Sequence, residues 1–149
     1  MRLVQVPAVM ALSSNFFACT NPATRPDKLT SAMRILDTWE WVESGAVASP
    51  GIKTPVTEGY TRTIRFERDQ SYYVYINDTL EAKYPYSILR TKIPAFMEDT
   101  DEVIRIEDFR SVVYYTFRFS CADSLTLWPL VFDAYGYNKY VRRKLLWYN

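Results

Sequence analysis

The sequence predicts an all-β protein: an eight-stranded antiparallel up-and-down barrel preceded by a short helix. Eight short aromatic-rich segments alternate in the manner of strands, and turn residues end each of them. No segment of helical length and period lies between them. Most connections are short, so consecutive strands are expected to pair as antiparallel neighbours. Closure of the first strand on the last would then hide the sheet edges.

The elements are expected in the following order. Residues 29–36 have apolar positions at helical spacing, with Thr30 or Ser31 as a cap, and predict a short helix. The strands are expected over residues 38–44, 60–67, 71–76, 80–89, 103–106, 111–120, 124–130 and 137–145. Asn77-Asp78 predicts a tight turn between the third and the fourth. In the first strand, alternation places Trp39 and Trp41 on one face, with Glu43 continuing it. Residues 45–59 hold three glycines and two prolines and predict a long loop.

Composition and charge exclude several classes of function. The net charge is +1, so no basic excess favours nucleic acid. The chain has no histidine, which excludes Ser-His-Asp and Cys-His catalysis, a histidine general base and histidine metal sites. Its two cysteines cannot build a structural zinc site alone. We therefore expect no enzymatic activity, no metal and no cofactor.

The acidic residues do not change that expectation. One cluster lacks the spacing and the glycine of an EF-hand, and a solvated loop is the simpler interpretation. Two other groups have the composition of acid–base pairs, but nothing in the sequence brings two carboxylates together. The cluster is Glu98, Asp99, Asp101 and Glu102, and the two groups are Glu107 with Asp108 and Glu40 with Glu43.

The first nineteen residues predict where the protein is located in the cell. Residues 1–18 read as a signal peptide, and the run Phe16-Phe17-Ala18-Cys19 resembles the lipobox of bacterial lipoproteins. Cys19 would be lipidated, residues 19–28 would form a tether, and residues 29–149 would form the domain. No acidic run follows Cys19, which favours a periplasm-facing outer-membrane lipoprotein. The alternative is an N-terminal extension of a cytosolic protein. If Cys19 is acylated, Cys121 has no disulfide partner.

The order of the elements resembles the lipocalins and the wider calycins, and more narrowly the lipocalin-like lipoproteins of Bacteroidetes. The matching segments are residues 36–44 (LDTWEWVES), 65–72 (RFERDQSY) and 140–144 (YVRRK), within a resemblance that spans about residues 29–145. The resemblance implies a structural stack in which an arginine of the last strand packs on Trp39. Arg142 is the first choice and Arg143 the alternative. Where the family has glycine two residues before this tryptophan, the chain has Asp37.

The resemblance also implies a ligand in the barrel, bound by bulky residues of the alternating strands. An eight-stranded barrel is either filled by side chains or holds one small ligand, and both alternatives stay open. A pocket that buries ~200 Å² of apolar ligand surface gains about 5 kcal/mol, against association costs of at least ~4 kcal/mol. Tyrosine hydroxyls or an inward arginine would therefore be needed. The expected lining residues are Phe66, Tyr72, Val74, Tyr115, Phe117 and Trp128.

Two functions follow from this sequence. The first is a membrane-tethered, non-catalytic binding module for a small apolar or amphipathic molecule. The second is a structural or protein-interaction barrel with a filled interior, which would meet a protein partner through outward residues such as Tyr73 and Tyr75.

Overall fold

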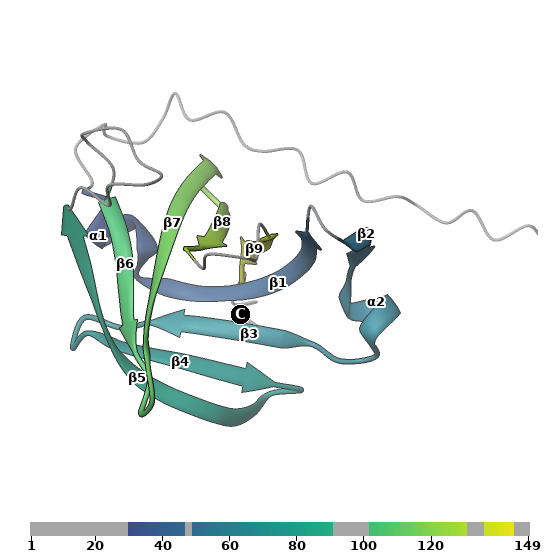
Figure 1. Cartoon of the computed structure of the whole chain (residues 1–149), viewed down its shortest axis with the longest axis horizontal. Helices are drawn as coiled ribbons and strands as arrows, with labels where there is room; N and C mark the ends of the chain where they lie inside the picture. Colours follow the sequence, from purple (N-terminus) through teal and green to yellow (C-terminus); the bar gives the residue numbers. More distant parts are fainter. Residues whose placement is uncertain (1–29, 47–48, 91–101, 131–135, 145–149) are drawn as a thin grey trace, which may run out of the picture.

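The expected barrel is confirmed by the computed structural model, which describes residues 30–46, 49–90, 102–130 and 136–144. One antiparallel sheet has the strand order β2-β1-β3-β4-β5-β6-β7-β8-β9, and pairing of β1 with β9 closes it (Figure 1). Eight strands form the barrel and β2 is an addition at its rim. The bounds are α1 Ser31–Ile35, β1 Asp37–Ala46, β2 Ser49–Lys53, α2 Pro55–Glu58, β3 Arg62–Phe66, β4 Ser71–Ile76, β5 Thr79–Arg90, β6 Glu102–Glu107, β7 Val112–Cys121, β8 Ser124–Pro129 and β9 Gly136–Arg142.

We expected a long loop over residues 45–59. The structure shows that this segment also contains the strand β2 and the helix α2. β1 runs beyond its partner β3, and its free edge pairs with β2 through Ser44–Lys53 and Ala46–Ser49. A capping box between Thr54 and Thr57 then starts α2, where the turn-forming prolines and glycines suggested irregular chain. In Figure 1, α1 and α2 lie at opposite sides of the barrel.

A β-bulge in β1 changes which side chains face inward. The register with β9 slips between Trp41 and Glu43, so that Val42 is an extra residue. Because side chains alternate along a strand, one extra residue exchanges the two faces beyond it. The expectation that Glu43 continues the tryptophan face is therefore wrong. Glu43 instead forms an ion pair with Lys139 at 3.8 Å, and Ser44 takes the inward position.

The β4–β5 hairpin has the expected tight turn. Asn77 and Asp78 have φ angles of 48° and 61°. Positive φ at both central residues is the requirement of a type I′ turn, whose twist matches that of the flanking strands. The side chain of Asn77 also accepts a hydrogen bond from the backbone N–H of Thr61 at 2.9 Å, which ties the turn to the start of β3.

The core draws on α1 and every barrel strand except β7. Its buried hydrophobic cluster consists of Ile35, Trp39, Trp41, Ile64, Phe66, Tyr72, Tyr86, Ile104, Ile106, Leu125, Leu127 and Tyr140. A second set packs against this cluster and is only partly buried: Tyr60, Val74, Tyr84, Ile88, Tyr115, Phe117 and Phe119. The wall formed by β4, β5 and β7 therefore presents apolar surface that the core does not fully cover.

Within the described ranges, no helix is long and apolar enough to cross a membrane.

Candidate functional site

One end of the barrel is closed by α1 and a tryptophan–arginine stack. The indole N–H of Trp39 donates to the backbone oxygen of Ile35 at 2.8 Å, and both side chains are fully buried. The guanidinium carbon of Arg142 lies 4.7 Å from the centroid of the Trp39 ring. Arg143, the alternative, points elsewhere and forms an ion pair with Glu40 at 3.1 Å.

The charge of Arg142 is compensated on several sides. Its Nη1 forms an ion pair with Asp37, and its Nε lies 3.4 Å from a carboxylate oxygen of Asp123. Its Nη2 donates to the backbone oxygens of Arg34 and Ala122 at 3.2 and 3.3 Å. Asp37 therefore serves as a counter-ion, and its carboxylate also accepts a hydrogen bond from the backbone N–H of Thr38. This arrangement is a structural stack.

A second arginine lies in the barrel with a different environment. Arg62 begins β3 and alternates with Ile64 and Phe66, which belong to the core. Its guanidinium carbon lies 5.1 Å from the Trp41 ring centroid and 5.6 Å from that of Tyr140. The side chain therefore points inward, among aromatic rings.

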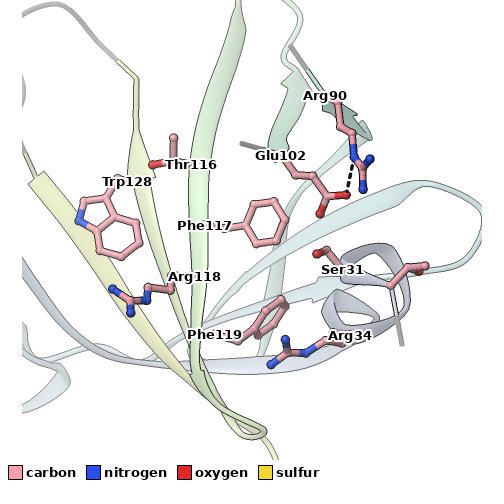
Figure 2. A pocket seen from close by; sticks show the side chains of 10 residues that line it. Ser31, Arg34, Arg90, Glu102, Thr116, Phe117, Arg118, Phe119 and Trp128 are labelled. Atoms are coloured by element: carbon pink, nitrogen blue, oxygen red, sulfur yellow. Dashed lines mark hydrogen bonds and ion pairs between the residues drawn. The ribbon is translucent and has the colours of Figure 1, made fainter. Parts of the chain in front are cut away.

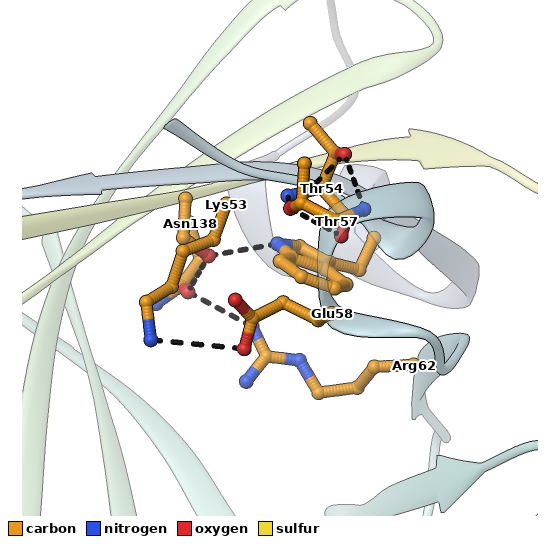
Figure 3. A network of polar contacts seen from close by, with 8 residues as sticks. Lys53, Thr54, Thr57, Glu58, Arg62 and Asn138 are labelled. Atoms are coloured by element: carbon orange, nitrogen blue, oxygen red, sulfur yellow. Dashed lines mark hydrogen bonds and ion pairs between the residues drawn. The ribbon is translucent and has the colours of Figure 1, made fainter. Parts of the chain in front are cut away.

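A relay of hydrogen bonds holds this arginine in place. The indole N–H of Trp41 donates to Ser44 Oγ at 2.8 Å, and that hydroxyl donates to Asn138 Oδ1 at 2.6 Å. The same amide oxygen accepts from Arg62 Nη2 at 2.8 Å (Figure 3). Two donors thus fix the Asn138 amide with its oxygen toward them and its NH₂ group turned away.

No carboxylate of the described chain forms an ion pair with the half-buried Arg62. Its Nε has no hydrogen-bond partner, which is also true of the Nε atoms of Arg65 and Arg142. The charged pair drawn nearby in Figure 3 is Glu58 with Lys53, whose atoms are 3.7 Å apart. A buried charge or polar group without a partner costs free energy, so native structures seldom keep one without a reason.

The tyrosines around Arg62 do not supply the missing negative charge. Burial raises the pKa of Tyr140 to about 12, although the charge of Arg62 lowers it. Burial likewise raises the pKa of Tyr72 and of Tyr115, with Arg62 acting in the opposite direction on both. All three hydroxyls are therefore neutral near pH 7, and each can donate a hydrogen bond. The surroundings of Arg62 are aromatic and uncharged.

An apolar ladder leads from this region toward α1. Tyr115, Phe117 and Phe119 alternate along β7, and all three are only partly buried. Phe117 and Phe119 line an open hollow of about 750 Å³. Figure 2 shows both rings pointing from β7 toward Ser31 and Arg34 of α1. The remaining lining residues are Thr30, Ser31, Arg34, Arg90, Glu102, Thr116, Arg118 and Trp128.

The structure separates the six expected ligand residues into three groups. Phe66 and Tyr72 are buried in the core, and their rings pack with centroids 4.9 Å apart. The second group, Val74, Tyr115 and Phe117, lies on the partly covered wall. Trp128 lies at the rim of the hollow and is 36% exposed, unlike its buried strand neighbour Leu127. These six residues do not line one common pocket.

Other expected residues have the following positions. Cys121 is a half-buried free thiol at the end of β7, and Cys19 lies outside the described residues. Glu98, Asp99 and Asp101 also lie outside them, whereas Glu102 forms an ion pair with Arg90 at 3.3 Å. In the part of the chain that is described, no group of three or more potential metal-ligating residues occurs.

Sequence reasoning missed Arg62, Asn138 and Ser44. A signal for Arg62 was present, because it alternates along the strand with Phe66, which was expected to line the interior. Ser44 carried no such signal, since only the bulge at Val42 turns it inward.

Comparisons with known proteins add no relative: no family model, no curated protein and no solved structure matches this chain. The class of protein is therefore defined by the fold and the site alone. It is a closed antiparallel barrel with one sealed end, a partly open aromatic wall and an arginine inside that lacks a counter-ion among the described residues.

Proposed function

We propose that this chain is a lipid-anchored, lipocalin-like module that binds one small amphipathic molecule in its barrel and performs no chemistry on it. The observation that carries the proposal is the wall of β4, β5 and β7, whose inward aromatic and aliphatic side chains stay partly uncovered beside an open hollow. Ligand sites are typically concave and mostly apolar, with a few polar groups that orient the ligand. The barrel interior has both features.

The free energy of binding favours an amphipathic ligand over a purely apolar one. An apolar contact of the size considered above leaves only about 1 kcal/mol after the cost of association. A hydrogen bond to a charged group adds roughly 1.5–3 kcal/mol. Arg62 and the surrounding tyrosine hydroxyls are polar groups suited to that contribution.

Binding of the uncharged fluorescent probe N-phenyl-1-naphthylamine tests this function. We expect saturable binding at one site per chain, and weaker binding by the variant Phe117→Ala. The matched control is Phe109→Ala, because Phe109 lies in the β6–β7 connection and is 97% exposed. Absence of saturable binding, or equal affinity of both variants and the parent, would contradict the proposal.

Attachment to a membrane is the second part of the proposal, and its basis is the sequence around Cys19. In a bacterial host, the full chain is expected to fractionate with membranes, and Cys19→Ser is expected to release it. A Cys19→Ser chain that stays in the membrane fraction would count against the anchor.

A protein-binding role is the competing proposal, and one outer surface favours it. Tyr73 and Tyr75 of β4 stack with ring centroids 6.4 Å apart, and the guanidinium carbon of Arg65 lies 4.7 Å from the Tyr73 ring centroid. Lys83 Nζ lies 5.1 Å from the same centroid. Aromatic and arginine side chains are enriched at interfaces. Loss of a copurifying partner on changing Tyr73 to Ser, with probe binding unaffected, would support this role.

A further inference from the structure

We propose that Arg62 binds the anionic head group of the ligand, a carboxylate or similar organic monoanion, while the ladder Tyr115–Phe117–Phe119 contacts its apolar part. This inference rests on the proposed function and specifies the class of ligand. It concerns the barrel interior: Arg62 lies on Trp41, and the far end of the ladder, Phe119, lies 6.0 Å from the Trp39 ring and 4.3 Å from the guanidinium carbon of Arg34.

The charge balance around Arg62 favours an anionic ligand. Its Nη2 donates to a neutral amide and no described carboxylate pairs with it, whereas Arg65 and Arg142, whose Nε atoms are unpartnered like its own, each have a carboxylate partner. A half-buried charge without a counter-ion gains when a ligand supplies one with good geometry and hydrogen bonds. A bound anion would supply the acceptor and the negative charge together. A neutral ligand would supply at most the acceptor.

The hydrogen-bonding groups that surround the charge are mostly donors. The Asn138 oxygen is already occupied by Ser44 and Arg62, so the amide offers only its NH₂ group to a ligand. The neutral hydroxyls of Tyr115 and Tyr140 can donate as well. A guanidinium presents a planar set of donors that matches a carboxylate. The site therefore has many donors and few free acceptors, which favours an anion.

The apolar ladder is placed to contact the rest of the ligand. Tyr115 packs against the core cluster that includes Trp41 and Tyr140, the two rings beside Arg62. Along β7, alternate residues on one face are separated by about 7 Å, so Tyr115 and Phe119 are about 13 Å apart. The ladder leads from the charge to the hollow beside α1. This geometry fits an elongated molecule with an acid at one end and an apolar chain.

The experiment measures how well decanoate and 1-decanol displace bound N-phenyl-1-naphthylamine. The two compounds have the same ten-carbon chain and differ in the head group, and each is used below its aggregation concentration. The parent chain is expected to bind decanoate more tightly than decanol. Arg62→Met is expected to weaken decanoate at least about tenfold and decanol clearly less, because the alcohol offers the guanidinium an acceptor but no negative charge. Arg62→Lys keeps the charge but loses the planar donors, and is expected to give an intermediate affinity.

The matched control is Arg65→Met, since Arg65 lies on the same strand, three residues away, and faces Tyr73 on the outside. It is expected to leave both displacers unchanged. If the probe binds and Arg62→Met leaves decanoate affinity intact, the inference is wrong and the binding function stands. An equal loss for decanoate and decanol would also overturn it, because pairing with the charge of Arg62 affects the acid more than the alcohol. If the parent binds no probe, the proposed function fails first, and this inference with it.

Discussion

Arg142 and Arg62 form similar contacts at two places in the barrel and yet have different surroundings. Each guanidinium lies against a tryptophan of β1, Trp39 for Arg142 and Trp41 for Arg62, and these tryptophans are two residues apart. Arg142 has two carboxylates and two backbone oxygens around it. Arg62 has one amide oxygen and the Tyr140 hydroxyl around it, and no carboxylate among the described residues.

This difference teaches that a cation–π contact does not by itself reveal what an arginine does. The contact is worth roughly 0.5–2 kcal/mol in either place. The compensation of the charge separates the two roles. A compensated arginine joins α1, β1 and β9 at the closed end, while an uncompensated one remains available to a charged ligand.

The largest expected effect is at the closed end. Trp39 is fully buried between α1 and Arg142, so Trp39→Ala removes a large side chain and leaves a cavity. We expect the free energy of unfolding to fall by about 3–5 kcal/mol. Urea denaturation followed by circular dichroism measures this loss. A loss below about 1 kcal/mol would mean that the stack does not hold this end of the barrel.

Replacing each arginine by methionine tests the comparison directly. Arg142→Met leaves Asp37 and Asp123 without their partner and is expected to cost roughly 2 kcal/mol, moderated by their partial exposure. Arg62→Met removes an unpaired charge from the interior, so the ligand-free protein is expected to be unchanged or more stable by about 1 kcal/mol. Urea denaturation of both variants measures whether each substitution lowers or raises the free energy of unfolding. Equal losses would erase the distinction between the two arginines.

Alkaline pH tests the environment of Arg62. Burial raises the pKa of Tyr140 to about 12, against about 10 in an unfolded chain. As pH rises from 10 to 12, the unfolded state releases this proton first, so the free energy of unfolding should fall by roughly 2–3 kcal/mol. Below pH 10 this contribution is fully present. Urea denaturation across this pH range should show a shallower decline for Tyr140→Phe than for the parent chain.

The smallest expected effect comes from introducing a counter-ion beside Arg62. Asn138→Asp keeps the size of the side chain and places a carboxylate 2.8 Å from Arg62, if the geometry of the amide oxygen is retained. The ligand-free protein is expected to gain about 1 kcal/mol, since the buried charge acquires a partner. Binding of decanoate should weaken and binding of decanol should not. Stronger decanoate binding in this variant would contradict the role given to Arg62.

The sequence predicted the barrel well, because alternation and turn residues act locally. The β4 bounds, the turn at Asn77 and Asp78, and the short helix before Trp39 all agree with the structure. The errors lie where tertiary pairing overrides local pattern. β2 forms because β1 extends past β3, and no composition rule shows that in advance. The last strand ends at Arg142, where its backbone N–H bonds to Asp123.

The candidate site was predicted in part. Aromatic size identified Phe117 and Tyr115 on the open wall, but it also selected Phe66 and Tyr72, which pack in the core. Residue size alone does not show whether a side chain packs in the core or lines open space, because that depends on its neighbours across the barrel. The requirement for an inward polar group was deduced from energetics, and Arg62 meets it.

The bulge in β1 has a genetic consequence. A deletion of the single codon for Val42 would restore strict alternation and leave Ser44 opposite Asn138 on the inside, because the register of the other residues with β9 stays the same. The hydroxyl that links the Trp41 indole and the Asn138 amide would keep its place. A gene that lost this codon would therefore still encode the polar interior, and only the local bend and twist of β1 would change.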